Sequence, residues 1–504
     1  MAALALMLQG TGSDVGKSML VAGLCRVLTR RGMRVLPFKP QNMSNNAAVA
    51  ADGGEIGRAQ WLQALACGAE PSVHMNPVLL KPQSDRTSQI IVQGRVHATA
   101  EAATYQQKKA ELLSFVLDSY YRLAQACDIV IVEGAGSPAE VNLRAGDIAN
   151  MGFAEAVDCP VLLVGDIDRG GVIASLVGTH NVLPPQEQAR IRGFIINKFR
   201  GDMRLFARGA AEVSERTGWP CLGMVPFSHA ARQLPQEDAV VLEKLRGEGH
   251  SEDIRICVPM LPRIANFDDL DPLRMEPDVS LTMVAAGSPI PACDLILIPG
   301  SKSTVADLAF MREQGWDIDI IAHARQGGFV LGLCGGYQML GAQLLDPAGV
   351  ESTQTSVLGL GLLNITTRFA QQKSVRNWVG STAQNNIPVS GYEIHMGQSQ
   401  GEDCKRPLFV ASGKPEGAQS ISGRIMGSYI HGMFTSDAFR HAFLSRIRLR
   451  EASALAYHAQ MEELLDSWAD LLEQQLDIDA LLKLAAPITL PAAAQTSRKP
   501  ARKA

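Results

Sequence analysis

The segment Gly10-Thr-Gly-Ser-Asp-Val-Gly-Lys-Ser18 decides the fold of the first half of this chain. It follows the apolar run Ala3–Leu8, which predicts a strand, and it opens Ser18–Arg30, which predicts a helix. In such a loop, backbone N–H groups face phosphates, the lysine neutralises phosphate oxygens and the serine hydroxyl can bind Mg²⁺. The segment therefore predicts an ATP site made by Gly10, Thr11, Gly12, Gly16, Lys17 and Ser18.

Strand and helix patterns alternate on both sides of one composition break, at residues 242–253. This alternation predicts an α/β protein of two layered domains, the first with a mostly parallel sheet. In the second half we expect strands over Leu295–Ile298, Phe329–Leu333 and Gly427–Ile430. The expected divisions are a P-loop domain over 1–241, a linker over 242–253, a second domain over 254–445, a helical segment over 446–484 and a disordered tail over 485–504.

The amino-acid composition limits the kinds of molecule that this protein is expected to bind. The 504 residues carry 47 Lys and Arg against 51 Asp and Glu, a formal net charge of −4, which argues against a nucleic acid as main partner. No apolar run reaches the ~18 residues of a membrane span. The nine cysteines are scattered singly, as in proteins of a reducing compartment. We expect a cytoplasmic protein that acts on small molecules; its oligomeric state stays open.

Polar residues elsewhere in the first half extend the predicted ATP site. Glu133 ends the apolar run 128–132, so it is a candidate Mg²⁺ ligand together with Ser18 and Asp52. Asn197, after another apolar run, fits the pattern by which an amide side chain contacts a purine edge. Three amide-rich and charged loops could form a carboxylate-substrate pocket facing the γ-phosphate, or could be exposed loops without a task. Their candidate residues are Lys39, Asn42, Asn45 and Lys81.

The segment Phe329-Val-Leu-Gly-Leu-Cys-Gly-Gly-Tyr-Gln-Met-Leu-Gly341 predicts a strand, a sharp turn and a helix. Such a turn exposes its central side chain, so Cys334 is the predicted nucleophile. His431 is the preferred base, with His395 as a competitor. The backbone of Gly335 and of Gly300, in the loop 299–302, would supply an oxyanion hole.

These motifs resemble those of known enzymes. The nucleophile turn, the loop PGSKS and the segment around His431 resemble a class I glutamine amidotransferase domain, and the first half resembles a dethiobiotin-synthetase-like ATP domain. Together with KPQNMSNNA, GGEIGRAQ, GDIDRGGV, INKFRGD and PRIANFDDLDPL, the order of domains closely resembles the cobyric acid synthase family over residues 4–440. The resemblance implies ATP, Mg²⁺ and glutamine as reactants, and amidation of carboxylates b, d, e and g of adenosylcobyrinic acid a,c-diamide.

One departure from the wider amidotransferase class concerns the base. Many of its members carry Glu two residues after the histidine, where this chain has Met433. The resemblance therefore implies a Cys–His dyad, and whether another group orients His431 is open. Ammonia would have to pass between the domains, and the loop Phe267–Asp271 could line that contact.

Three other functions fit parts of the sequence. A cobyrinic acid a,c-diamide synthase would have the same two domain types. A partitioning-type P-loop ATPase would use the first domain as an interaction switch, although the reactive turn at Cys334 argues against it. A glutaminase-like scaffold would hydrolyse glutamine without coupling to ATP.

Overall fold

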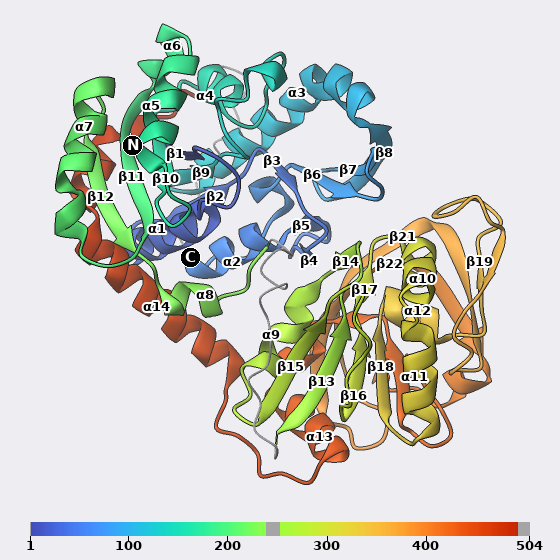
Figure 1. Cartoon of the computed structure of the whole chain (residues 1–504). Coiled ribbons are helices and arrows are strands. Elements are labelled where there is room, and N and C mark those ends of the chain that lie inside the picture. The colour runs from blue at the N-terminus through green and yellow to red at the C-terminus, as the bar shows by residue number, and fades with distance from the viewer. Residues whose placement is uncertain (1, 238–252, 492–504) are drawn as a thin grey trace, which may run out of the picture.

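A computed structural model describes residues 2–237 and 253–491, which form two α/β domains (Figure 1). The first domain is built on a sheet with strand order β12-β11-β10-β1-β9-β2, in which each neighbouring pair is parallel. Its strands are β1 (Leu4–Gly10), β2 (Val35–Phe38), β9 (Ile129–Glu133), β10 (Val161–Asp166), β11 (Ile191–Phe199) and β12 (Cys221–Pro226). Because parallel strands end at one edge, the segments after β1 and β9 meet there.

Helices cover this sheet because their apolar residues recur at helical spacing. In α1, for example, Leu20, Leu24 and Leu28 are buried while Arg30 is exposed. The helices of the first domain are α1 (Lys17–Arg30), α2 (Arg58–Ala66), α3 (Ala102–Ala126), α4 (Met151–Ala156), α5 (Val172–Val182), α6 (Pro185–Gln188), α7 (Ala207–Thr217) and α8 (His229–Gln233).

A small sheet and a hairpin extend the first domain toward the second (Figure 1). The sheet has the order β3-β6-β7-β8, and β4 pairs with β5. Ala47 and Val49 of β4 share a buried apolar cluster with Tyr392 and Ile394 of the second domain, so the two domains pack directly. The bounds are β3 (Gln41–Met43), β4 (Ala47–Val49), β5 (Glu55–Gly57), β6 (Val78–Pro82), β7 (Thr87–Val92) and β8 (Arg95–Glu101).

The second domain combines two sheets. The first has the order β15-β13-β16-β18-β26-β25 and is parallel except for β25. The second follows the path β20-β19-β21-β22-β27 and is dominated by the long hairpin of β21 and β22, with β23 and β24 at its edge. A short pair, β14 with β17, lies between the sheets and the first domain (Figure 1).

The strands of the second domain are β13 (Ile254–Pro259), β14 (Ile264–Ala265), β15 (Val279–Val284), β16 (Leu295–Ile298), β17 (Gly300–Ser301), β18 (Phe329–Leu333), β19 (Gln343–Leu345), β20 (Ser356–Leu358), β21 (Ile365–Thr382), β22 (Pro388–Gly401), β23 (Phe409–Ala411), β24 (Lys414–Glu416), β25 (Ala418–Gln419), β26 (Ile425–Ser428) and β27 (Ile430–His431). Its helices are α9 (Asp271–Arg274), α10 (Thr304–Glu313), α11 (Trp316–Arg325), α12 (Gly335–Leu340) and α13 (Asp437–Ile447).

The single strand expected over Gly427–Ile430 is wrong in extent. The strand β26 ends at Ser428, and β27 begins at Ile430 in the other sheet. The chain switches sheets at Tyr429, and β27 pairs with β22 so that His431 lies opposite Tyr392. This switch carries His431 to the boundary of the two sheets, beside the end of β18.

The last segment of the chain returns to the first domain. The helix α14 (Tyr457–Gln475) packs along α1, and α15 (Ile478–Leu484) follows it. The prediction of a disordered tail from residue 485 is wrong for the first residues of that tail, because β28 (Ala486–Pro487) pairs with β1 and Ile488 is buried. Residues 492–504 of that tail, and the expected linker except Asp253, lie outside the described residues.

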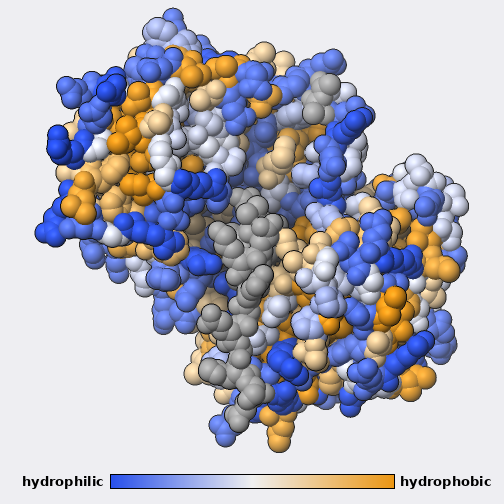
Figure 2. Space-filling model, viewed as in Figure 1, coloured by the Kyte–Doolittle hydropathy of each residue, from blue (hydrophilic) through white to orange (hydrophobic). Residues whose placement is uncertain are grey.

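The visible surface of both domains mixes hydrophilic and apolar residues (Figure 2). No helix among the described residues has the length and apolar character needed to cross a bilayer.

Candidate functional site

The predicted phosphate loop lies between β1 and α1, as its flanking patterns indicate. Gly16 has φ +91°, and a Cβ at this position would lie 2.3 Å from Nδ2 of Asn197. Only glycine adopts this conformation in such close contact without strain. The Lys17 ammonium donates to the carbonyl oxygens of Gly12 (3.0 Å) and Gly136 (3.1 Å), so it lies across the loop it belongs to.

Glu133 lies at the centre of a buried polar cluster beside this loop. One carboxylate oxygen accepts a hydrogen bond from Ser18 Oγ at 2.7 Å and pairs with Lys39 Nζ at 2.8 Å. The other accepts one from Gln63 Nε2 at 2.6 Å. Burial alone would raise the pKa of Glu133, but the charge of Lys39 and these hydrogen bonds lower it below its usual value. The group is therefore an ionised carboxylate beside a serine hydroxyl, a donor pair that suits Mg²⁺.

The structure brings together six of the residues predicted for the ATP, metal and acceptor sites. They line a cavity that we call the P-loop pocket, which includes Gly16, Lys17, Ser18, Lys39, Asn42 and Glu133. Asn42 Nδ2 donates to Glu237 (2.6 Å) and Gln60 (3.0 Å), so its amide group is held at the pocket wall. Asn45 is half-buried in the same loop but does not line this pocket.

Asn197 contacts the phosphate loop from the end of β11. Its Nδ2 group donates to the carbonyl of Val15 at 2.8 Å, inside the loop. This buried hydrogen bond supports the loop conformation. An amide group has a second N–H and an acceptor oxygen, so the contact of Asn197 with a purine stays a prediction.

Asp52 does not join the predicted metal site. Its carboxylate accepts hydrogen bonds from Ser72 Oγ (2.7 Å) and from the backbone N–H of Val73 (3.1 Å). It follows β4 in the turn toward β5 and lines a separate cavity with His74 and Arg122. This carboxylate fixes the start of a short helical turn, a common use of Asp that the sequence pattern does not separate from metal binding.

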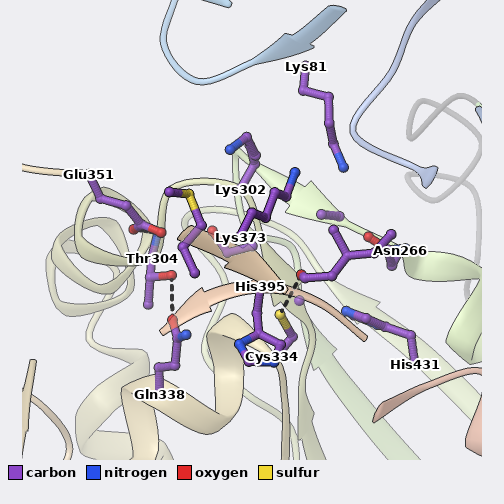
Figure 3. A pocket seen from close by; sticks show the side chains of 15 residues that line it. Lys81, Asn266, Lys302, Thr304, Cys334, Gln338, Glu351, Lys373, His395 and His431 are labelled. Carbon is purple, nitrogen blue, oxygen red and sulfur yellow. Dashed lines mark hydrogen bonds between the residues drawn. The ribbon is translucent and has the colours of Figure 1, made fainter. Parts of the chain in front are cut away.

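Lys81 lies in the predicted nucleophile site around Cys334, and not in the predicted pocket that would face the γ-phosphate of ATP. It is carried by β6, and the small sheet that contains β6 faces the second domain. Its ammonium pairs with Glu55 at 2.9 Å, both side chains being buried. Lys81 thus lines the cavity around Cys334, which we call the thiol pocket and which also includes Gly300, Lys302, Glu351, Lys373, His395 and His431 (Figure 3).

The predicted turn at Cys334 is present and strained. Cys334 joins β18 to α12 with φ 49° and ψ −103°, a conformation that a non-glycine residue rarely adopts. The glycines around it are required by packing, because a Cβ on Gly336 would lie 2.2 Å from the carbonyl oxygen of Ile298. Cys334 is 8% exposed, and its thiol lies in the thiol pocket (Figure 3).

His431 stands between the thiol and a carboxylate that the sequence did not suggest as its partner. Its Nδ1 lies 2.7 Å from Asp269 Oδ2, and the other oxygen of Asp269 accepts a hydrogen bond from the backbone N–H of Gly432. Burial alone would lower the pKa of His431, but the charge and hydrogen bond of Asp269, together with Cys334, raise it to about 10. From the sequence, Asp269 is expected only as part of a possible interdomain contact. Its distance along the chain from His431 does not indicate that the two side chains meet.

His395, the competing base, lies in the same pocket but is held differently. Its Nδ1 contacts the carbonyl of Gly397 at 2.8 Å, and its ring stacks on Tyr429 with centroids 3.8 Å apart. Its other nitrogen is 3.6 Å from Glu393. The geometry favours His431 as the partner of Cys334, because its imidazole contacts both Cys334 and the Asp269 carboxylate, whereas the two ring nitrogens of His395 face Gly397 and Glu393.

The two predicted oxyanion donors come close together. Gly335 begins α12, and a Cβ on it would lie 2.9 Å from the backbone nitrogen of Ser301. Gly300 precedes Ser301 on β17 and lines the thiol pocket. The absence of a side chain at 335 thus lets two backbone segments approach the same side of the pocket.

A group of buried charges at the thiol pocket was missed by the sequence analysis. Glu55 of the first domain pairs with Lys81 (2.9 Å) and with Lys373 of the second (2.5 Å). Glu351 accepts a hydrogen bond from the backbone of Thr304 at 2.8 Å. These residues lie far apart along the chain on polar segments, so only the folded arrangement reveals the group.

Comparisons with known proteins match both domains. A model described as "CobQ/CobB/MinD/ParA nucleotide binding domain" matches residues 6–241, and a model described as "CobB/CobQ-like glutamine amidotransferase domain" matches residues 255–439. The chain is 56% identical to the cobyric acid synthase of Brucella suis biovar 1 over 483 residues, 95% of this chain and 99% of that one. It is 58% identical to the cobyric acid synthase of Rhizobium rhizogenes (94% and 98% covered) and of Novosphingobium aromaticivorans (96% and 99%). With both domains matched and nearly the full length aligned, this chain belongs to the cobyric acid synthase family.

Proposed function

We propose that this chain uses ATP and glutamine to amidate carboxylates b, d, e and g of adenosylcobyrinic acid a,c-diamide, giving adenosylcobyric acid in cobalamin biosynthesis. The observation that carries this proposal is the line of Cys334, His431 and Asp269 in the same molecule as a phosphate loop. The expected setting is the cytoplasm, with small molecules as reactants.

The thiol pocket supports hydrolysis of glutamine. Cys334 Sγ attacks the side-chain amide carbon, and His431 gives its proton to the departing nitrogen, so ammonia leaves and a glutamyl thioester remains. Water then attacks the thioester and releases glutamate. Because the pKa of His431 is raised to about 10, its proton is in place at neutral pH. Backbone donors of Gly335 and Gly300 would stabilise the oxyanion, each contributing ~3 kcal/mol to lowering the barrier.

The charges of the thiol pocket suit a free amino acid. Glutamine carries an α-ammonium and an α-carboxylate besides its amide. Glu351 offers a carboxylate, and Lys302 and Lys373 offer ammonium groups, along the wall opposite His431 (Figure 3). We assign Glu351 to the α-ammonium and the two lysines to the α-carboxylate.

The P-loop pocket supports activation of the acceptor acid. A carboxylate does not react with ammonia at neutral pH, because its oxygen is a poor leaving group. Transfer of the γ-phosphoryl group of ATP to a carboxylate oxygen gives a mixed anhydride and ADP; ammonia then displaces phosphate. Lys17 stabilises the transferred charge, and Lys39 lies within the same pocket. Ser18 and Glu133 would hold Mg²⁺, which neutralises charge on the phosphate oxygens when bound.

The contact between the domains gives ammonia a possible route from one half-reaction to the other in this proposal. The thiol pocket is lined by Lys81 of the first domain, so its wall is part of the domain that binds ATP. Asn266, next to the turn that holds Asp269, donates to the carbonyl of Ala47 in the first domain. Ammonia released at Cys334 would therefore leave along the domain contact rather than into solvent.

Mass spectrometry of the corrinoid product tests this proposal. With ATP, Mg²⁺ and glutamine, we expect four successive losses of about one mass unit from adenosylcobyrinic acid a,c-diamide. Amidation of the a and c carboxylates of cobyrinic acid instead would indicate the a,c-diamide synthase. ATP hydrolysis at a rate that neither acceptor changes would indicate a P-loop ATPase acting as an interaction switch. Glutamine hydrolysis that is not coupled to ATP would indicate a glutaminase-like scaffold. Membership of the family named above does not favour these alternatives.

The variant Cys334→Ser separates the two half-reactions. It removes the nucleophile but leaves the P-loop pocket intact, so we expect loss of glutamine-dependent amidation and retention of amidation with added ammonium salt. Undiminished activity with glutamine would overturn the role of Cys334.

A further inference from the structure

Arg58 reaches from the first domain into the second. It is the first residue of α2, and its Nε atom lies 3.2 Å from Oδ2 of Asp268. Both side chains are buried, with 6% and 2% exposure. The guanidinium group also lies over the ring of Trp61, 4.1 Å from its centroid, so the side chain is held from two directions. The contact is therefore largely shielded from solvent, and each of the two charges is balanced by the other.

Asp268 and Asp269 are adjacent on one buried 3₁₀ turn, Phe267–Leu270. Asp268 faces Arg58, whereas Asp269 faces His431 and the backbone of Gly432. Within the described part of the chain, Arg58 is the cation that forms an ion pair with Asp268. Two neighbouring residues thus join the first domain to the imidazole of the thiol pocket.

The burial of Asp268 makes this contact important for the turn. Burial raises the pKa of the Asp268 carboxyl group, and the charge of Arg58 opposes that rise. Without Arg58, the buried Asp268 carboxylate would lose its counter-charge and keep the long 3.5 Å hydrogen bond from the Tyr392 hydroxyl; the turn would then move to hydrate it, or the group would take up a proton. Either change alters the position or the charge environment of Asp269, one residue along the same turn.

We propose that Arg58 is a positioning residue for glutamine hydrolysis: through Asp268 and Asp269 it holds His431 in the orientation that serves Cys334. This inference rests on the proposed function of the thiol pocket and adds that the amidotransferase site is completed by the ATP-binding domain. The helix α2 also carries Gln63, which donates to Glu133 of the P-loop pocket. The test must therefore separate the two pockets.

The test compares Arg58→Met and Arg58→Lys in the full chain. Glutamate release gives kcat and KM for glutamine, and corrinoid amidation with ammonium salt reports on the P-loop pocket. A misplaced catalytic group costs roughly 100-fold in rate, so we expect kcat for glutamate release to fall about 10- to 100-fold in Arg58→Met with KM for glutamine unchanged. Arg58→Lys retains the charge, and we expect it to recover part of the lost kcat.

Two controls identify the route of the effect. Arg26→Gln removes an arginine of the same domain that pairs with Glu462 and Asp466 instead, and we expect no change in glutamate release. Asp268→Asn should reproduce the fall in kcat, and the double variant Arg58→Met/Asp268→Asn should be no worse than either single variant. If Arg58→Met does not fold, Arg58→Lys and Asp268→Asn carry the comparison.

Three results would overturn the inference: unchanged kcat for glutamate release in Arg58→Met or Asp268→Asn, fully additive losses in the double variant, or an equal fall in ammonia-dependent amidation. A wild-type chain that releases glutamate but does not amidate the corrinoid would contradict the proposed function and leave the assignment of Arg58 testable by glutamate release alone.

Discussion

At the scale of single residues, the structure supplies a third member to the expected pair of Cys334 and His431. Met433 occupies the position where a Glu is common in the wider class, and Asp269 approaches His431 from a distant part of the chain. A carboxylate in this place selects the tautomer of the imidazole and stabilises its charged form. The sequence leaves open which group orients His431. In the fold, that group is the carboxylate of Asp269, which precedes Cys334 in the chain.

We expect Asp269→Asn to lower kcat for glutamine hydrolysis by about 10³- to 10⁴-fold, because an amide cannot stabilise the imidazolium. Glutamate release measures this effect. Amidation with ammonium salt serves as the control and should stay near the wild-type rate. A loss of less than tenfold would mean that His431 is oriented by other groups.

The pKa of His431 also predicts a pH dependence of stability. Burial lowers this pKa, but Asp269 outweighs burial and raises it from 6.5 to about 10. A raised folded-state pKa stabilises the protein fully below pH 6.5, and the contribution is lost as the pH rises toward 10. We therefore expect the difference in melting temperature between wild type and Asp269→Asn to be largest near pH 6 and to narrow by pH 10. A difference that is constant with pH would contradict this ion pair.

At the scale of elements, each site depends on a turn between a strand and a helix. In the phosphate loop, φ is positive at Gly16 and at Asp14, whereas in the nucleophile turn it is positive at Cys334. Glycine and aspartate adopt a positive φ more readily than other residues, so the combination of φ 49° and ψ −103° at Cys334 makes the second turn the more strained one. A strained turn keeps the thiol at the end of β18, and the surrounding glycines admit the neighbouring backbone.

The variant Gly16→Ala tests the fit of the phosphate loop. Its Cβ would lie 2.3 Å from Asn197 Nδ2, so we expect loss of the Asn197–Val15 hydrogen bond and at least tenfold weaker ATP binding, measured by calorimetry. Gly32→Ala is the matched control: its φ is +84°, but nothing lies within 4 Å of the added atom. It should cost about 1 kcal/mol of stability and leave ATP binding unchanged. Equal ATP affinity in both variants would contradict the steric argument.

At the scale of the whole molecule, the chain crosses between domains more than once. After the second domain, α14 returns and packs along α1, with Trp468 Nε1 donating to the carbonyl of Met19 at 2.7 Å. Together with the apolar cluster around Tyr392 and the ion pair of Arg58, this return fixes one domain against the other. Such a contact suits an enzyme in which a product of one site is a reactant at the other.

We expect Trp468→Ala to weaken the first domain rather than the second. The side chain is 3% exposed, and its removal leaves a cavity beside α1 that costs about 3–5 kcal/mol. Hydrogen exchange should become faster in α1 while β18 keeps its protection. Leu449→Ala, at a side chain that is 96% exposed, serves as the control. Equal loss of protection in both domains would show that they unfold as one unit.

The fold class, the phosphate loop and the nucleophile turn could be predicted from the amino-acid sequence. Each of these is local: an apolar strand, a glycine-rich turn and a helix follow one another within about fifteen residues, and their order specifies the backbone. The order of motifs also indicated the family. Glu133 was predicted for the same reason, because a residue that ends a buried parallel strand lies at the ligand edge of the sheet.

The partners of the other charged side chains could be identified only from the folded chain. Asp269 and His431 are 162 residues apart, and Arg58 and Asp268 lie in different domains. Lys81 and Asp52 lie in polar segments punctuated by proline or glycine, as Lys39 does, yet Lys81 lines the thiol pocket and Asp52 holds a turn. The physical reason is that a charged side chain is recognisable in sequence, whereas the partner that balances its charge is chosen by packing of distant segments.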